Sequence, residues 1–223
     1  MNNMYEFIKE TRNFIGGECP HKCSYCYVKS SPYPIVKERY SGKIRLFENE
    51  FKKGLGKDKF IFIGSCFDMF AYEVPKEFIK KVLGYCKKFD NTYLFQSKTP
   101  TRFFEFVNDF PDKIHLGTTI ETNRITDKQL ADRLGMRRVT DCVKFVTIEP
   151  IMDFTLSQLT QLIYLIKPDY VNIGADSKKS NLKEPSAKKI RELISELKHF
   201  TEVKIKSNLK RLLWNPTQKQ SYS

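Results

Sequence analysis

The sequence predicts a parallel α/β fold, because short apolar runs alternate with amphipathic stretches along the chain. Six runs rich in β-branched and aromatic residues show little polar alternation, as expected of strands covered on both faces. They span residues 13–17, 59–65, 92–97, 113–120, 143–148 and 170–175. Strands that alternate with helices in this way are typical of a parallel sheet, either doubly wound or closed into a full or partial barrel.

The stretches between these runs carry apolar residues at helical spacing. Residues 75–88 open with Pro75, which suits the first position of a helix. Residues 155–166 and 185–199 repeat the same spacing. In either architecture the carboxyl ends of the strands meet at one edge, where loops carry the chemistry. We therefore expect a functional site built from residues 16–26, 64–68, 97–98, 118–121, 149–150 and 174–176.

The composition excludes several classes of protein. The chain has 223 residues, of which 40% are hydrophobic and 13% aromatic, so it resembles a globular protein that can bury a core. No run approaches the roughly 18–20 apolar residues of a membrane-spanning helix, and the first residues lack the apolar stretch of a secretory signal. We expect a cytoplasmic protein without a membrane partner.

The charge is positive and unevenly distributed. There are 39 Lys and Arg against 26 Asp and Glu, a formal net charge of +13. Residues 178–223 hold twelve of these Lys and Arg but only four Glu. This excess favours a polyanionic partner, although solvated lysines on a surface helix give the same composition. The segment contains Lys178, Lys179, Lys183, Lys188, Lys189, Arg191, Lys204, Lys206, Lys210 and Arg211, with Trp214 and Tyr222 in its tail.

The six cysteines fall into two sets. Cys19, Cys23 and Cys26 form a C-x3-C-x2-C motif directly after the first predicted strand, whereas the other three lie far apart. In a cytosolic protein this pattern does not indicate disulfides. Thiolates suit zinc or iron–sulfur centres, but structural zinc usually takes four protein ligands, and no second cysteine pair is present. A [4Fe–4S] cluster held by three cysteines leaves one iron open, which suits catalysis.

Tyr25 directly precedes the last cysteine of this motif, and a repeated strand–helix pattern follows it. In these features the chain resembles the radical SAM superfamily, and the resemblance covers nearly the whole sequence. The resemblance implies a partial (β/α)6 TIM-like barrel, with residues 1–223 as a single core domain that ends in a basic segment from about residue 178. It also implies that the three cysteines hold a [4Fe–4S] cluster and that S-adenosylmethionine (SAM) binds the fourth iron. Reductive cleavage of SAM then gives methionine and a 5′-deoxyadenosyl radical, which abstracts hydrogen from the substrate.

Other segments resemble one branch of this superfamily. Where many members carry Gly-Gly-Glu after the second strand, this chain has GSCFDMF at residues 64–70, and a later strand ends in Lys98. That arrangement is similar to the spore photoproduct lyase family and its relatives. The segments FIGSCFDMF, LFQSKTPTRF, HLGTTIET, FVTIEPIMD and VNIGADS also resemble an uncharacterised radical SAM family that is common in phage genomes.

The resemblance implies a set of SAM contacts at the strand ends. Asp68 is expected to accept hydrogen bonds from the SAM ammonium, and Lys98 to meet the SAM carboxylate. The other expected contacts of the cofactor are Tyr25, Gly64, Ser65, Thr119, Glu121 and Glu149. Structural alternatives stay open for these residues. In them, Asp68 caps the segment that follows it, Lys98 is a solvated surface lysine, and Glu121 and Glu149 cap a segment or form ion pairs.

Cys66 precedes Asp68 by two residues at the mouth of the predicted barrel. In the spore photoproduct lyase family a cysteine near the corresponding loop returns a hydrogen atom to the product radical, although the position differs by one residue here. Cys66 is therefore either a hydrogen donor or a structural thiol. Cys86 and Cys142 are expected to be structural.

The expected reaction is radical modification or repair of a nucleic acid base or nucleotide. An open barrel with a basic C-terminal part suits a substrate whose phosphates meet Lys and Arg while a base enters the pocket. The resemblance also implies an electron donor such as flavodoxin or ferredoxin. Two alternatives remain: an activase that installs a glycyl radical in a partner protein, and a zinc-loop nucleic-acid-binding module without catalysis.

Overall fold

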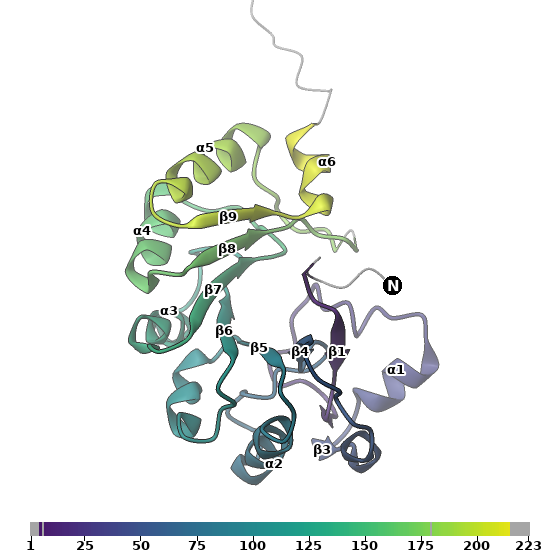
Figure 1. The fold of residues 1–223 in the computed structure, drawn as a ribbon. Helices are drawn as coiled ribbons and strands as arrows, with labels where there is room; N and C mark the ends of the chain where they lie inside the picture. The colour runs from purple at the N-terminus through teal and green to yellow at the C-terminus, as the bar shows by residue number, and fades with distance from the viewer. Residues whose placement is uncertain (1–4, 6, 179, 215–223) are drawn as a thin grey trace, which may run out of the picture.

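A parallel sheet forms the centre of the fold (Figure 1). The computed structural model describes residues 5, 7–178 and 180–214. Within them, seven strands follow one another in space as they do in the chain, and all neighbours are parallel. They are β1 (Glu10–Arg12), β4 (Phe60–Ile63), β5 (Thr92–Ser97), β6 (Ile114–Thr119), β7 (Val143–Ile148), β8 (Tyr170–Ile173) and β9 (Glu202–Ile205). Because the order of these strands does not reverse, the sheet is not doubly wound.

Helices connect the strands and cover one face of the sheet. The connecting helices are α2 (Lys76–Cys86), α3 (Asp127–Gly135), α4 (Leu156–Ile166) and α5 (Ala187–Lys198). Figure 1 shows them on the convex side of the curved sheet. The helices α2, α4 and α5 confirm the three predicted amphipathic stretches. Each buries its apolar stripe, as Ile190, Leu193 and Leu197 of α5 illustrate.

Shorter elements complete the described chain. They are α1 (Pro34–Arg39), α6 (Lys210–Leu213) and the 3₁₀ helices Glu48–Lys52, Pro100–Phe106, Met136–Arg138 and Ser207–Leu209. A separate antiparallel pair joins β2 (Ile15–Gly16) to β3 (Arg45–Leu46). None of the helices in residues 5, 7–178 and 180–214 is long and apolar enough to cross a membrane.

Two details of the strand prediction are wrong. The first strand of the seven-stranded sheet lies at Glu10–Arg12, and the run predicted at residues 13–17 contains only the two-residue strand β2 of the antiparallel pair. Gly16 and Gly17 approach other backbone closely there. A Cβ on Gly16 would come 2.5 Å from the Arg39 carbonyl oxygen. The sequence pattern also misses β9, because charged and apolar residues alternate along this strand at the edge of the sheet.

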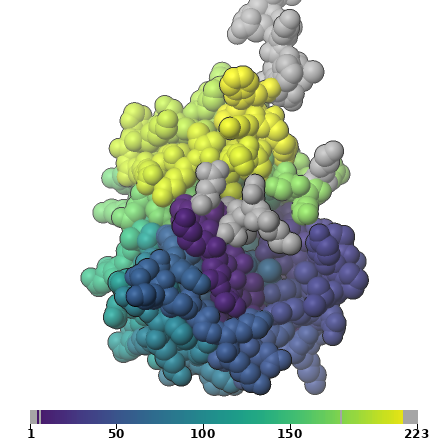
Figure 2. Space-filling view, turned by 45° about the vertical axis from the view of Figure 1, so that its right-hand side comes forward, coloured from purple at the N-terminus to yellow at the C-terminus, as the bar shows by residue number. Residues whose placement is uncertain are grey.

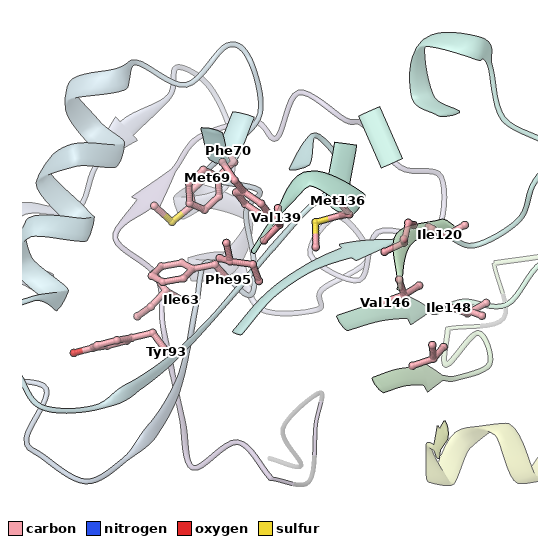
Figure 3. Packing of buried hydrophobic residues seen from close by; sticks show 14 of the residues in the cluster. Ile63, Met69, Phe70, Tyr93, Phe95, Ile120, Met136, Val139, Val146 and Ile148 are labelled. Carbon is pink, nitrogen blue, oxygen red and sulfur yellow. The ribbon is translucent and has the colours of Figure 1, made fainter. Parts of the chain in front are cut away.

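Apolar side chains pack on both faces of the sheet. Between the sheet and the helices, Ile63, Phe95 and Val146 belong to a cluster with Phe70 and Met136 (Figure 3). This layer fixes the strands relative to the helices, so the positions of the loops at the carboxyl edge are set by a close-packed core.

The N-terminal segment covers the other face. Tyr5 and Ile8 pack there with Phe62, Phe145 and Tyr170. The Tyr5 hydroxyl is hydrogen-bonded to Thr147 (2.7 Å) and donates to Gln96. Figure 2 shows the purple N-terminal residues between the yellow C-terminal part and the blue part of the chain. Tyr5 and Ile8 therefore cover part of the concave face.

Candidate functional site

The cysteine motif lies in a loop between β2 and α1. Cys19, Cys23 and Cys26 are each half-buried. Turns connect them: the Lys22 N–H donates to the Cys19 carbonyl (3.3 Å), and the Cys26 N–H donates to the Cys23 carbonyl (3.2 Å). Burial raises the pKa of the Cys19 thiol to about 11 and also raises the pKa of Cys23, although the Lys98 ammonium favours the Cys23 thiolate.

The three thiols do not converge on one point. Among the described residues, no group of three or more His, Cys, Asp and Glu side chains is placed to hold a metal ion. Structural zinc needs four ligands around one centre, and the described residues do not bring four such ligands together. A [4Fe–4S] cluster binds each thiolate through a different iron, so three half-buried thiols in one loop are a donor set that suits such a cluster.

Asp68 ties the cysteine loop to the ends of β4 and β5. Its carboxylate accepts hydrogen bonds from the Lys98 N–H (2.8 Å), the Ser97 hydroxyl (3.0 Å) and the Phe70 N–H (3.0 Å), and it contacts His21 Nε2 (2.7 Å). Burial raises the pKa of Asp68, but these hydrogen bonds outweigh it, so the pKa lies below its usual value. The hydrogen bond from the Phe70 N–H means that Asp68 caps the segment that follows it, as the structural alternative predicts. The contact with His21 also holds the cysteine loop in place.

Tyr25, Lys98 and Glu121 form a buried polar cluster. The Lys98 ammonium donates to the Tyr25 hydroxyl (2.7 Å) and to Glu121, and the Tyr25 hydroxyl also donates to Glu121. Burial lowers the pKa of Lys98 to about 8 and raises the pKa of Glu121. The sequence places these residues in three separate loops, and the parallel sheet brings the loops together.

A pocket of about 450 Å³ opens beside this cluster. Its walls come from the cysteine loop, the ends of β5 and β6, the segment after β4, and α3. Cys23, Tyr25, Lys98 and Glu121 all line it. Four of the predicted site residues therefore meet at one cavity.

Arg133 on α3 is a pocket residue that the sequence analysis misses. Its side chain lines the pocket although the residue is only 4% exposed. Its Nε donates to the Thr119 carbonyl (2.7 Å), and its terminal nitrogens have no hydrogen-bond partner among the described residues. A buried guanidinium with unused donors suits an anionic ligand. The sequence signal that was available is the Thr126–Gln129 capping box, which marks the start of α3.

Cys66 lies in a separate polar environment at the end of β4. Its N–H donates to the Asn13 side chain (2.9 Å), which also donates to the Ser65 hydroxyl (3.1 Å). The Tyr27 hydroxyl donates to the Ser65 carbonyl (2.8 Å) and lies 3.3 Å from the Cys66 sulfur. Burial raises the pKa of Tyr27, so its hydroxyl keeps its proton. Gly64, at φ +83°, forms the turn that presents this loop.

Two other predicted residues are bonded within the protein. The Glu149 carboxylate accepts from the Lys206 ammonium and from the Asn208 amide (2.9 Å). The Thr119 hydroxyl accepts from the Gln96 amide (2.6 Å). Neither side chain lines the pocket beside the cysteine loop.

Six of the ten basic residues that the structure describes in the C-terminal segment have acidic partners. The ion pairs are Lys189–Asp153 (2.6 Å), Lys183–Asp153 (3.8 Å), Lys188–Glu192 (4.0 Å), Lys204–Glu202 (3.6 Å), Lys206–Glu149 and Arg211–Glu184. The Arg191 guanidinium donates to the Leu213 carbonyl (3.4 Å), and Trp214 is 83% exposed. Lys179 and Tyr222 lie outside the described residues. The excess charge of this segment is therefore partly neutralised within the protein.

The fold is similar to solved structures of spore photoproduct lyase. A double mutant with bound AdoMet and dinucleoside spore photoproduct has a TM-score of 0.60 at 11% identity, over 86% of this chain and 74% of that chain. A single mutant with dinucleoside spore photoproduct gives the same values, and another single mutant has a TM-score of 0.59 at 10% identity over the same shares of both chains. At this identity the likeness shows a shared fold.

The family of the chain is shown by its sequence. The model of the family described as "Protein of unknown function (DUF5131)" matches residues 5–197, so the chain belongs to this family. The curated proteins contain no match.

Proposed function

We propose that this chain is a radical SAM iron–sulfur enzyme that acts on a nucleic acid base or nucleotide. One observation carries the proposal: the cysteine loop and the buried Tyr25–Lys98–Glu121 cluster border the same pocket at the carboxyl edge of a parallel sheet. The similar fold of a spore photoproduct lyase structure with bound AdoMet supports it.

The same proposal extends to the architecture. The curved sheet is then the partial (β/α)6 TIM-like barrel of a radical SAM core that spans residues 1–223, with a basic segment from about residue 178. We also propose that the chain is related to the phage-type radical SAM family, because its motifs resemble those of that family.

Cys19, Cys23 and Cys26 would hold the [4Fe–4S] cluster. When bound, the cluster supplies the electron that cleaves SAM into methionine and a 5′-deoxyadenosyl radical. The protein must deprotonate its thiols to bind iron, and burial raises the pKa of Cys19 and Cys23, so cluster binding releases protons. The His21–Asp68 contact holds the loop in place for this purpose.

The pocket suits the zwitterionic end of SAM. Burial disfavours the charges of both Lys98 and Glu121, and an ammonium and a carboxylate from the ligand would complement them. Arg133 offers unused donors for the carboxylate, so we assign it to that group beside Lys98. Glu121 then accepts from the ammonium, and Tyr25 orients both charged side chains.

Other predicted contacts receive structural roles in this proposal. Asp68 already makes four contacts within the protein, three of them at one carboxylate oxygen, so we assign it to the positioning of the cysteine loop. Thr119 and Glu149 are bonded to Gln96 and Lys206, and we assign them to the support of the strand ends. Ser65 and Gly64 stay candidates for contact with the ribose, because they form the loop beside the cysteines.

Cys66 is our candidate hydrogen donor. Its thiol would give a hydrogen atom to a carbon-centred product radical, which forms a C–H bond and leaves a thiyl radical. The Tyr27 hydroxyl, 3.3 Å from the sulfur, fixes the orientation of the thiol. A Cys66→Ala variant should still cleave SAM but should return less of the normal product.

The test uses anaerobically reconstituted protein, reduced with dithionite and given SAM. An electron donor such as flavodoxin or ferredoxin would replace dithionite in the cell. We expect 5′-deoxyadenosine to form, with more formed when DNA or RNA is added and a new nucleoside mass recovered from it. Zinc in place of iron and sulfide would refute the proposal. Stimulation by a partner protein, but not by nucleic acid, would refute the assigned substrate class.

A further inference from the structure

Three side chains at the mouth of the pocket have no role in the proposed binding of SAM. Tyr72 follows β4, Arg124 follows β6, and Lys128 lies in the first turn of α3. All three line the 450 Å³ pocket that also contains Cys23. All three are exposed, so they lie where the pocket meets solvent.

Lys128 is a cation without an ion-pair partner among the described residues. Its ammonium lies 5.6 Å from the centroid of the Tyr72 ring and is exposed to solvent. Six of the ten described cations of the C-terminal segment differ from it, since they lie within 4.0 Å of a carboxylate. Lys128 can therefore meet a phosphate without first breaking a bond inside the protein.

Arg124 extends the positive charge of the mouth. Its guanidinium lies 2.9 Å from Asp153, and its side chain is 52% exposed. Lys189 (2.6 Å) and Lys183 (3.8 Å) share the same carboxylate. Three cations thus surround one anion, so this part of the rim keeps a positive charge that attracts a polyanion, although the acidic side chains of Glu73 and Asp132 also line the pocket.

Tyr72 supplies an exposed aromatic ring in a fixed orientation. The residue is 46% exposed, and its hydroxyl donates to Asp132 (2.7 Å) and is hydrogen-bonded to Thr101 (2.8 Å). Because the ring is already held, stacking on a base costs little further side-chain entropy.

We propose that Tyr72, Arg124 and Lys128 bind a single-stranded or locally unpaired nucleic acid at the mouth of the pocket. Lys128 and Arg124 bind phosphates, and Tyr72 stacks on a base beside the one that enters. This inference rests on the proposed function and deepens it, because it assigns the substrate contact to three residues that line the pocket.

The test measures binding of fluorescent single-stranded DNA and RNA of one sequence to the reconstituted full chain, by anisotropy between about 50 and 200 mM salt. Lys128→Glu should weaken binding at least about tenfold and reduce the slope of log K against log salt by about 0.7 or more. Tyr72→Ala should weaken binding about 5- to 150-fold with little change in slope, whereas Tyr72→Phe should keep most of the affinity.

Lys188→Glu is the matched control, because Lys188 is an 82% exposed lysine of the C-terminal segment. We expect it to change affinity less than about threefold, because Lys188 does not line the pocket and lies beside Glu192 on the exposed surface. An equal loss in Lys188→Glu and Lys128→Glu, or no loss in Tyr72→Ala, would overturn the proposal.

SAM cleavage without nucleic acid is measured in the same samples and separates the two proposals. If SAM is cleaved but neither DNA nor RNA binds at low salt, the proposed nucleic-acid contact is refuted while the enzyme class stands. If DNA or RNA binds through Lys128 and Tyr72 but no SAM is cleaved, the proposed nucleic-acid contact stands and the enzyme class is refuted.

Discussion

Glu121 and Glu149 follow the neighbouring strands β6 and β7, and each forms an ion pair with a lysine from another strand end. Glu121 pairs with Lys98 after β5, and Glu149 pairs with Lys206 after β9. Both pairs are largely removed from solvent at the same edge of the sheet. From the sequence alone the two glutamates are equivalent candidates.

The two pairs differ in what surrounds them. Glu149 also accepts from Asn208, whose amide in turn donates to the Ala175 carbonyl (2.8 Å), so this network is satisfied within the protein. The Glu121 pair borders a pocket together with Cys23 and with Arg133, which has unused donors. A satisfied network stabilises the fold, whereas an incomplete one can bind a charged ligand.

The largest effect is expected from Cys23→Ala on the pocket side. Reconstituted wild-type protein should hold about four iron and four sulfide per chain, and the variant should lose the cluster, because one thiolate ligand is missing. Cys142→Ala is the control and should retain iron. Iron and sulfide analysis with the visible absorbance spectrum measures both. An intact cluster in Cys23→Ala would contradict the assignment of the loop.

The second-largest effect is expected on SAM affinity when the unused hydrogen-bond donors of Arg133 are removed. Arg133→Gln should weaken SAM binding about 10- to 150-fold, because a charge-assisted hydrogen bond is worth about 1.5–3 kcal/mol. Arg133→Lys keeps the charge but loses the planar fork, so it should bind with intermediate affinity. Anaerobic equilibrium dialysis gives the affinity. Binding as tight as that of wild type in both variants would place the SAM carboxylate elsewhere.

Glu149→Gln tests the other member of the comparison. It leaves Lys206 without its carboxylate partner, so the free energy of unfolding should fall by about 1.5–3 kcal/mol. Affinity for SAM should stay at the wild-type value, since Glu149 does not line the pocket. Urea unfolding and dialysis measure the two quantities. A loss of SAM affinity like that of Arg133→Gln would remove the distinction between the two pairs.

The smallest effect is expected from His115, near the start of β6 and away from the pocket. Burial, aided by the positive charge of Lys204, lowers the pKa of His115 to about 4, against about 6.5 in an unfolded chain. The unfolded chain binds the extra proton first, so stability is lost as pH falls from about 6.5 towards 4. In protein without iron, His115→Gln should lose less stability between about pH 7 and 5, as urea midpoints would show. Equal losses in both proteins would assign the acid sensitivity to other groups.

The sequence predicts the elements that are buried on both faces. Residues 92–97 and 143–148 coincide with β5 and β7, because continuous apolar runs have few alternatives to a covered strand. The site residues Tyr25, Lys98 and Glu121 are predictable for a related reason: each lies in a loop that parallel strands bring to one edge.

Arg133 and β9 are not predictable in this way. Arg133 lies inside a polar helix, where an arginine is usually solvated, and its burial depends on how α3 packs beside the cysteine loop. The strand β9 alternates like an exposed segment, so its presence, and with it the pairing of Lys206 with Glu149, follows from tertiary structure. The sequence therefore locates the edge at which the site lies, but not which charged residues there stay free for a ligand.

Electron paramagnetic resonance of the reduced protein tests the central claim most directly, because a ligand at an open iron changes the signal of the cluster. Wild type, Glu149→Gln and Arg133→Gln are compared with and without SAM at one concentration that saturates wild type. We predict that SAM changes the spectrum of wild type and Glu149→Gln fully, whereas the spectrum of Arg133→Gln changes less, because its weaker affinity leaves part of the protein without SAM. A wild-type spectrum that SAM does not alter, or an equal response in Arg133→Gln, would contradict the assignment of this pocket to SAM.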